Sequence, residues 1–485
     1  MSQHPAKRIG LFLGPILAVI MMLVGAPDGL SFAAWGTGAL LVWMAIWWAT
    51  EAIPIAVTSL LPLVVLPLVG AGSPKDIGAG YAHHVVLLLF GGFVVALGIE
   101  RWNLHKRIAL NVVARVGATP YQIIFGFMLA TGLLSMWISN TATTLMMVPI
   151  ALSAASALND RTGGFTTALL LGICYAASIG GVGTPIGTPT NLIALDWLQA
   201  NVEGIEVGFV QWMGVGVPAV LLLIPVAWWS VTRGMPELEK SDAAMESVRL
   251  DLKSLGGMTT PEIRVATIFG IVALLWVSRL WTVKLAEHYG WDTLANYSGA
   301  QVDMMIAIAG AVAMFVVPSG DRSQDTRALL NWNEAVKLPW GVLVLFGGGI
   351  TLGNTIKSTG LSAWIGNQME FLSGFPMLLF VLIVVTLVLF LTELTSNVAT
   401  MTTLTPILGP LAVGIGIAPA SLLAPAAVAA SCAFMLPVAT APNAIIYATD
   451  KVTMQQMMTA GLRVNLIGIL IISVIGVTLA PMLLG

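Results

Sequence analysis

The stretch Ser135-Met-Trp-Ile-Ser-Asn-Thr-Ala-Thr-Thr144 decides how this chain must fold, because it places five hydroxyl side chains and one amide inside an apolar run. No charged residue occurs from Val116 to Asn159. One membrane helix needs roughly 20 apolar residues, so this run is long enough for two helices with the polar stretch between them. Unpaired backbone groups facing lipid are costly. We therefore predict a re-entrant helical hairpin over about 118–157, with a tip that is packed in protein or lines a watery cavity.

The same pattern returns in the second half of the chain. The sequence Ser396-Asn-Val-Ala-Thr-Met-Thr-Thr-Leu-Thr-Pro-Ile407 matches the twelve residues from Ser139 to Ile150 at six positions, including the Ser-Asn pair and the final Pro-Ile. This second motif predicts another re-entrant hairpin, over about 374–416.

The composition is that of a polytopic membrane protein. Hydrophobic residues make up 57% of the chain, charged residues 9%, and the mean hydropathy is +0.91. An ordinary soluble domain has about 25% charged residues. The net charge of −2 offers no basic face for a nucleic acid, so nucleic acid is not an expected partner, and the lipid bilayer is.

Apart from the two hairpins, eleven apolar segments could cross a membrane. They lie near 9–27, 33–49, 54–70, 85–100, 165–181, 208–232, 264–281, 300–318, 339–356, 421–436 and 462–482. If each hairpin returns to its own side, a cytoplasmic N-terminus places all of the 21 Lys and Arg residues inside except Lys75, Arg279, Lys284 and Lys357. This strong positive-inside bias predicts an inner-membrane protein with its N-terminus cytoplasmic and its C-terminus outside.

Under this topology the two hairpins enter from opposite sides, which is the layout of an inverted repeat. Two further pairs of similar segments support the repeat: Leu89-Phe-Gly-Gly92 with Leu345-Phe-Gly-Gly348, and Thr188-Pro-Thr-Asn191 with Thr440-Ala-Pro-Asn443. Inverted repeats place a binding site near the midplane in secondary transporters. We expect a first half at 1–232, a cytoplasmic linker at 233–263 that carries a short surface helix, and a second half at 264–485.

The two tips should meet two stretches rich in Pro and Gly, namely residues 180–191 and 436–443. Such stretches break a membrane helix and free backbone carbonyls and amides. Freed carbonyls can hold a hard cation, while amides at helix N-termini favour an anion. Ser, Asn and Thr could simply cap the broken helices, but the repetition of one motif favours a binding site.

Glu393 is the one acid within the second hairpin. It could neutralise a coupling cation or proton, or form a salt bridge to the scaffold, and its position three residues before Ser396 favours a supporting role. The sequence contains no HExxH motif, no GxSxG motif with partners and no Walker loop. It therefore lacks these motifs of hydrolytic enzymes and of ATP-driven pumps.

At these motifs the chain resembles the divalent anion/sodium symporter family, which includes bacterial dicarboxylate transporters and animal sodium–dicarboxylate and citrate carriers. The resemblance covers almost the whole chain. It implies an all-α homodimer of eleven-helix subunits, each with a scaffold domain and a transport domain that moves like an elevator.

The resemblance also implies site residues. The residues expected around the substrate carboxylates are Ser139, Asn140, Thr141, Thr188, Ser396, Asn397, Val398, Thr440 and Ala441. One sodium ion would lie among Ser135, Ser139, Asn140 and Gly187. A second would lie among Thr392, Thr395, Asn397 and Ala439, partly through main-chain oxygens.

Val398 departs from the bacterial members that this chain resembles, because Thr is usual there. The missing hydroxyl removes a hydrogen bond to a charged group that is worth about 1.5–3 kcal/mol, so the second carboxylate could be held differently or another anion preferred. The animal carriers are similar in having Val at this place. Ala441, where Pro is frequent, is a smaller departure.

The sequence thus predicts a sodium-coupled symporter of C4-dicarboxylates such as succinate, malate or fumarate. An exchanger of dicarboxylates or of other divalent anions, such as citrate or sulfate, that is not coupled to sodium is the alternative within the same class. A channel for anions is a further alternative from a different class.

Overall fold

The structure, a computed structural model, describes residues 5–117, 119–158, 160, 162–202, 208–235, 242–290, 293, 296–320, 328–368 and 376–485. Within these residues the fold is built from helices, with one isolated bridge between Pro318 and Ala328. The prediction of an all-α protein is confirmed for this part of the chain.

The helices, in chain order, are α1 (Pro5–Val24), α2 (Phe32–Thr50), α3 (Ile55–Thr58), α4 (Leu61–Leu68), α5 (Pro74–Ala79), the 3-10 helix η1 (Gly80–Ala82), α6 (His84–Arg101), α7 (Leu104–Val116), α8 (Pro120–Ser135), α9 (Asn140–Ser156), α10 (Gly164–Gly181), α11 (Pro189–Asn201), α12 (Phe209–Thr232), α13 (Asp242–Ser254), α14 (Thr260–His288), α16 (Gly299–Val316), α17 (Trp332–Ala335), α18 (Trp340–Ser358), α19 (Leu361–Gln368), α20 (Met377–Thr392), α21 (Asn397–Gly414), α22 (Ala420–Ala430), α23 (Ala441–Tyr447) and α24 (Met454–Leu484).

Many of these helices are apolar enough for a membrane. Eight described helical segments have the length and hydropathy needed to span, and shorter apolar helices cover 55–68, 120–135, 377–392 and 420–430. Each of the eleven apolar segments named from the sequence contains helix. The described residues therefore have the character of a polytopic membrane protein.

Both polar motifs separate two helices. Residues 136–139 join α8 to α9, and residues 393–396 join α20 to α21. The α8 helix begins with a capping box in which Thr119 and Gln122 exchange hydrogen bonds, and Pro120 occupies its first turn. The first residue of the expected first hairpin, 118, and the first two of the second, 374–375, lie outside the described residues.

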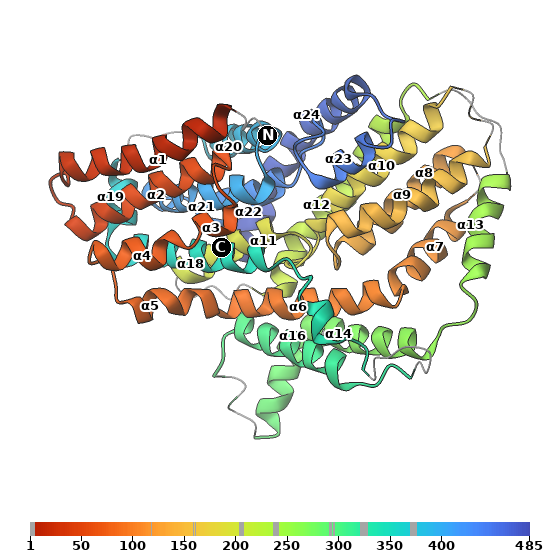
Figure 1. Ribbon diagram of the computed structural model, residues 1–485, viewed down its shortest axis with the longest axis horizontal. Coiled ribbons are helices and arrows are strands. Elements are labelled where there is room, and N and C mark those ends of the chain that lie inside the picture. The colour runs from red at the N-terminus through yellow and green to blue at the C-terminus, as the bar shows by residue number, and fades with distance from the viewer. Residues whose placement is uncertain are drawn as a thin grey trace.

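The helices form two groups that meet around these breaks. One group contains α8–α12 and α20–α24, in which α10 packs on α8, α9 and α12, and α24 packs on α12, α20 and α22. The other contains α1–α6 with α14, α16, α17 and α18, in which α6 packs on α16 and α18 packs on α3, α4 and η1. Figure 1 shows α14 and α16 along one edge of the molecule and α24 along the opposite edge.

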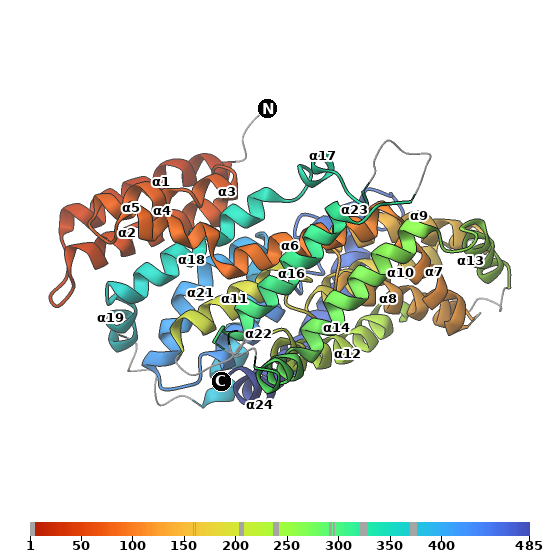
Figure 2. The same ribbon diagram turned by 90° about the horizontal axis from the view of Figure 1, so that it is seen from below.

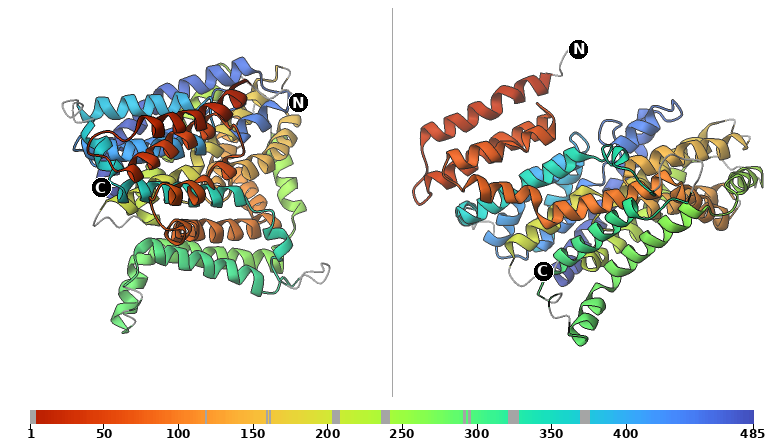
Figure 3. Two further views of the ribbon diagram at one scale, coloured as in Figure 1. Left: turned by 60° about the vertical axis from the view of Figure 1, so that its left-hand side comes forward. Right: turned by 60° about the horizontal axis from the view of Figure 1, so that its bottom comes forward.

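The N-terminal helices lie at one end of the molecule. In Figures 1 and 2, α1, α2, α4 and α5 lie at one end and α13 lies at the other. Figure 3 shows the same N-terminal layer in red, set beside the remaining helices. The α1 and α2 helices pack so closely that a Cβ atom on Gly10 would lie 2.7 Å from the Thr50 Cβ atom. Trp47 Nε1 also donates to the Leu11 carbonyl at 3.3 Å.

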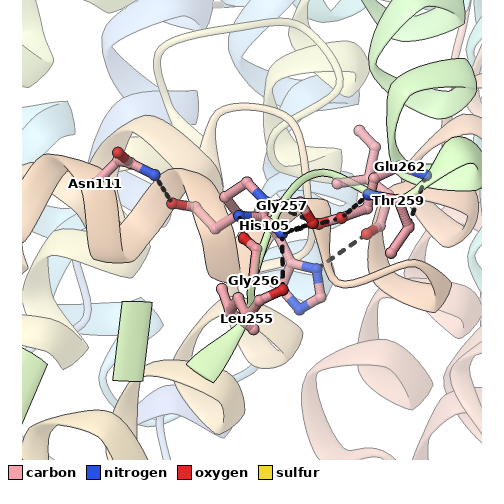
Figure 4. A network of polar contacts seen from close by, with 9 residues as sticks. His105, Asn111, Leu255, Gly256, Gly257, Thr259 and Glu262 are labelled. Carbon is pink, nitrogen blue, oxygen red and sulfur yellow. Dashed lines mark hydrogen bonds and ion pairs between the residues drawn. The ribbon is translucent and has the colours of Figure 1, made fainter. Parts of the chain in front are cut away.

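The segment 233–263, which the sequence predicts to be a linker, contains a helix. This helix, α13, packs on α7 and α9. Arg107 in α7 ties the residues after α13 in place, because its guanidinium donates to the carbonyls of Leu255, Gly256 and Gly257 at 2.9–3.3 Å. The same guanidinium pairs with the buried Glu262 carboxylate at 3.0 Å. Figure 4 shows the surrounding network, with Thr259 and Glu262 at the start of α14.

Arg279, which the charge count assigns to the outer side, lies inside the protein. Its side chain is buried and pairs with Asp303 at 2.9 Å, between α14 and α16. Burial of an arginine requires such a partner, and the sequence separation of 24 residues hides the pair. Arg279 therefore carries little weight in the positive-inside count, whereas Lys75 and Lys357 remain exposed.

Candidate functional site between the two helix breaks

Asn140 closes the first break through its side chain. The Ser135 hydroxyl lies 2.7 Å from Asn140 Oδ1 and 2.7 Å from the Ala177 carbonyl, so it holds the end of α8, the start of α9 and the middle of α10 together. The Ser139 hydroxyl caps α9 by accepting from the Ala142 N–H at 3.2 Å. The polar tip is thus packed in protein, with Ser135 fully buried.

The second break repeats the contact between a hydroxyl and an asparagine, but the Ser396 hydroxyl does not cap α21 as Ser139 caps α9. The Thr392 hydroxyl lies 2.9 Å from Asn397 Oδ1 and 2.7 Å from the Ala430 carbonyl. In both breaks the hydroxyl stands five residues before the asparagine. Nearby, the Thr395 hydroxyl forms a hydrogen bond with another hydroxyl, that of Thr400, at 2.6 Å. Two separate parts of the sequence therefore share one contact among a hydroxyl, an asparagine and a carbonyl.

A second pair of asparagines holds the breaks after α10 and α22. Asn191 Nδ2 donates to the carbonyls of Gly181 and Thr184 at 2.9 and 2.8 Å. Asn443 Nδ2 donates to the carbonyls of Ala433 and Leu436 at 3.0 and 2.8 Å. The sequence separations are ten and seven residues in both cases. Both asparagines are completely buried, so their amides supply the donors that an irregular backbone inside a membrane protein needs.

The two breaks face one cavity of about 830 Å³. All nine residues expected around the substrate line it: Ser139, Asn140, Thr141, Thr188, Ser396, Asn397, Val398, Thr440 and Ala441. They belong to the first turns of α9, α11, α21 and α23 or to the residues just before them. The cavity also contacts the other group of helices, through Phe93 of α6 and Val342 of α18.

The residues expected around sodium are divided between the cavity wall and the layer behind it. Ser139, Asn140, Gly187, Thr395, Asn397 and Ala439 line the cavity. Ser135 and Thr392 are fully buried behind it and touch the cavity-lining asparagines. All the expected residues are thus brought together around the two breaks.

The donor set of the first break fits a hard cation. A Cβ atom on Gly181 would lie 2.6 Å from Asn140 Oδ1 and 3.2 Å from the Gly187 carbonyl oxygen. A Cβ atom on Gly187 would lie 3.0 Å from the Met136 carbonyl oxygen. An amide oxygen and main-chain oxygens therefore lie close together where only glycine fits, and oxygen ligands are those that hard cations prefer.

Sequence reasoning missed two features of the cavity. Lys7 and Glu51 line it and form an ion pair with 3.3 Å between Nζ and Oε2. They are the only charged residues on its described wall. Their separation of 44 residues gives no sequence signal, although Glu51 has the left-handed backbone conformation (φ 46°) that ends α2.

The second missed feature is an aromatic stack behind the first tip. Trp137 lines the cavity and stacks on Phe209 with 5.8 Å between ring centroids, and Phe209 stacks on Trp276 at 4.6 Å. The stack attaches the first tip to α12 and α14. Three aromatic residues so far apart in the chain could not be paired from the sequence.

The chain is similar to transporters over its whole length. It is 39% identical to the sodium-dependent dicarboxylate transporter SdcS of Staphylococcus saprophyticus, covering 100% of this chain and 93% of the relative. It is 40% identical to SdcS of Staphylococcus aureus strain USA300, covering 99% and 92%.

Two solved structures share the fold. The Alcanivorax borkumensis YdaH transporter superposes with a TM-score of 0.58 at 16% identity, over 92% of this chain and 98% of that one. Neisseria gonorrhoeae MtrF, described as belonging to a class of antimetabolite efflux pumps, superposes with a TM-score of 0.60 at 15% identity, over 94% and 97%.

The family model described as the sodium:sulfate symporter transmembrane region matches residues 6–485. Its match covers both Ser-Asn motifs, both Asn-held breaks and the cavity between them. The chain is therefore a transporter of the divalent anion/sodium symporter family, as its motifs predicted.

Proposed function

We propose that this chain is a secondary active transporter that carries C4-dicarboxylates such as succinate, malate or fumarate across the inner membrane, coupled to sodium. The single observation that carries this proposal is the cavity between the two Ser-Asn breaks, whose wall presents amides, hydroxyls and helix N-termini from both halves. The name of the full-length relatives, sodium-dependent dicarboxylate transporter, supports the same substrate class and coupling ion.

The proposed substrate site recognises carboxylates with neutral groups. Helix N-termini carry free N–H groups and a partial positive charge, so the starts of α9 and α21 suit the two ends of a dicarboxylate. The Asn140 and Asn397 amides, with the hydroxyls of Ser139 and Thr440, add donors whose spacing depends on the two breaks. Bound sodium supplies the positive charge that these neutral groups lack.

Two cation sites are proposed, one at each break. The first uses Ser135, Ser139, Asn140 and Gly187, and the second uses Thr392, Thr395, Asn397 and Ala439. Because Asn140 and Asn397 belong both to the cation sets and to the cavity wall, a cation there would orient the amide that meets the substrate. This shared residue gives coupling a physical basis.

The transport cycle is proposed to be of the elevator type. The group of α8–α12 and α20–α24 carries both breaks, and the group of α1–α6, α14, α16, α17 and α18 supplies the facing wall of the cavity. If the first group moves against the second as a body, the site alternates between the two sides while its own contacts persist. We further propose an inverted repeat of the halves 1–232 and 264–485, a homodimer, and a cytoplasmic N-terminus with an outside C-terminus. The matching hydrogen bonds of the two breaks support the repeat.

The test is uptake of labelled succinate by proteoliposomes with and without an inward sodium gradient. We expect uptake to collapse when choline replaces sodium, and unlabelled malate to compete better than citrate, sulfate or aspartate. Counterflow of preloaded substrate without any sodium would instead indicate an exchanger. An ohmic, sodium-independent current would indicate a channel, and either result would contradict the proposal.

A further inference from the structure

Glu393 has a set of partners that no expectation from the sequence included. Its carboxylate is buried where α20 ends, and its Oε1 atom accepts from the N–H groups of Phe434 and Met435 at 2.9 and 3.1 Å. Oε2 accepts from the N–H groups of Met435 and Leu436 at 3.0 and 3.2 Å. Asn465 Nδ2 in α24 donates to Oε1 at 2.8 Å. Each of these partners is an amide that donates, and an ionised carboxylate, which only accepts, satisfies them all.

The same backbone amides are satisfied differently in the first half. Phe434 and Met435 stand nine and eight residues before Asn443, as Val182 and Gly183 stand before Asn191. The N–H groups of Val182 and Gly183 bond to carbonyls three residues earlier, at 3.1 and 2.9 Å. The break after α10 is therefore closed by its own turns, whereas the break after α22 is closed by a side chain from another helix.

The first half also has no charge at the place of Glu393. Glu393 stands four residues before Asn397, and the residue four before Asn140 is Met136. The Met136 side chain packs on Gly183, where an added Cβ atom would lie 2.8 Å from its methyl carbon. The repeated architecture is thus broken at one position, with a carboxylate in one half and a thioether in the other.

We propose that Glu393 is the positioning residue of the second break, and that it makes the cation site of the second half depend on a fixed negative charge that the first half lacks. The carboxylate holds Leu436, and the Leu436 carbonyl in turn accepts from the Ala439 N–H at 3.2 Å and from Asn443. Ala439 and Thr440 line the cavity. Glu393 therefore acts through the 434–440 segment without belonging to the cavity wall.

This inference rests on the proposed function only for its link to sodium. The positioning role concerns the backbone itself and does not require a cation. A fixed anion near a cation site increases the affinity of that site by Coulomb attraction. The two proposed cation sites should then differ in affinity, and only the second should respond to a change at residue 393.

The native Cys432 thiol reports the position of this segment. It is 1% exposed and lies two residues before Phe434. It can be studied alone in a Cys174→Ser background, because the serine hydroxyl can still donate to Asn443 Oδ1 as the Cys174 thiol does at 2.8 Å. Glu393→Gln replaces one acceptor oxygen by an NH2 group that faces backbone donors. We expect maleimide labelling of Cys432 in the folded protein to accelerate about tenfold or more, because a lost buried hydrogen bond to a charged group has that magnitude. Glu393→Asp keeps the charge and should restore part of the protection.

Sodium-dependent stabilisation gives the second measurement. The apparent Tm of the purified protein is followed as sodium replaces choline, since a ligand of the folded state stabilises it according to its affinity. In Glu393→Gln we expect the sodium concentration for half of the Tm shift to rise about tenfold. Glu262→Gln is the matched control, because Glu262 is also a buried, hydrogen-bonded carboxylate but lies at the start of α14, away from the cavity. It should lower the Tm in choline, with an unchanged sodium shift and unchanged Cys432 labelling.

Equal protection of Cys432 in Glu393→Gln and in the parent protein, with an unchanged sodium shift, would overturn the inference. Failure of the proposed function looks different. In that case the parent protein itself would show neither sodium-dependent uptake nor a sodium shift, while faster labelling of Cys432 in Glu393→Gln would still support the positioning role.

Discussion

Asn140 and Asn397 each combine two tasks in one side chain. Their Oδ1 atoms accept from the hydroxyls of Ser135 and Thr392, and the side chains also reach the cavity. An asparagine amide has both a donor and an acceptor end, so one end can be fixed by the protein while the other remains for a ligand. These two ends explain how an uncharged residue at the centre of each break can bind both the protein and a ligand.

We expect Asn140→Ala and Asn397→Ala each to reduce the kcat/KM of succinate uptake by about 10- to 100-fold, because a hydrogen bond to a charged group is worth about 1.5–3 kcal/mol. Uptake into proteoliposomes measures the change, and size-exclusion chromatography checks that the protein remains folded. Asn111→Ala is the control, because the Asn111 amide donates to the Arg107 carbonyl within α7, away from the cavity. Unchanged uptake in both tip variants would contradict the assignment of these amides to the substrate.

Val398 offers the opposite test, a gain of affinity. Its side chain lines the cavity, one residue after Asn397. Val398→Thr replaces one methyl group of the side chain by a hydroxyl of similar volume. We expect the KM for succinate to fall by up to about tenfold, because the hydroxyl adds one hydrogen bond to a carboxylate. Competition by citrate and sulfate, measured in the same vesicles, shows whether selectivity changes with affinity. A higher KM for succinate would show that the cavity prefers an apolar wall at this position.

The site residues in the motifs could be predicted because polar side chains stand out in an apolar run. All nine residues expected around the substrate line one cavity. The pairs Lys7 with Glu51 and Arg279 with Asp303 were not predictable. Each depends on how two helices pack, which a single sequence does not encode in its periodicity. The partners of Glu393 could not be predicted for a different reason. Most of them are backbone N–H groups, which almost every residue has, so no residue type indicates them.

At the scale of elements, the breaks depend on buried amides as much as on Pro and Gly. Glycine and proline follow directly where α10 ends, but Asn191 and Asn443 explain why the segments after α10 and α22 each take one fixed shape. The positions of helix ends within the Gly-rich stretch 180–187 could not be read from the sequence, because glycine permits several backbone conformations.

We therefore expect Asn191→Ala and Asn443→Ala to destabilise the folded protein by about 2 kcal/mol or more, since each leaves two buried carbonyls without their donor. The apparent Tm in detergent measures the effect. Asn201→Ala is the control in the same helix as Asn191, because its amide donates only to the Trp197 carbonyl one turn earlier. An equal Tm loss in Asn201→Ala would show that these amides have no special role in the breaks.

At the scale of the whole molecule, the contact between the two helix groups includes a small gap of about 30 Å³ between α11, α18 and α21. Gly353 of α18 lines this gap, and a Cβ atom there would meet nothing within 4 Å. An elevator movement requires α11 and α21 to slide past α18, so a large side chain at this place should interlock the two groups.

We expect Gly353→Trp to abolish succinate uptake while the Tm shift produced by sodium and succinate persists, because the binding residues lie in another cavity. Gly353→Ala is the matched control and should transport normally, since its methyl group has room. Normal uptake by Gly353→Trp would contradict sliding at this contact. The number of crossings, the inverted repeat and the dimer stay predictions from charge bias, repeated motifs and resemblance. Accessibility and mass measurements on the intact protein test them.

We expect the ion pair at the wall of the cavity between the two breaks to affect how readily a dianion leaves. Lys7 and Glu51 are each about half exposed, with side-chain exposures of 45% and 46%, and their charges cancel. A lone lysine there would form a local trap for a departing dianion, and a lone glutamate would repel an arriving one. Compensation leaves the passage electrically neutral, so turnover should depend only weakly on ionic strength.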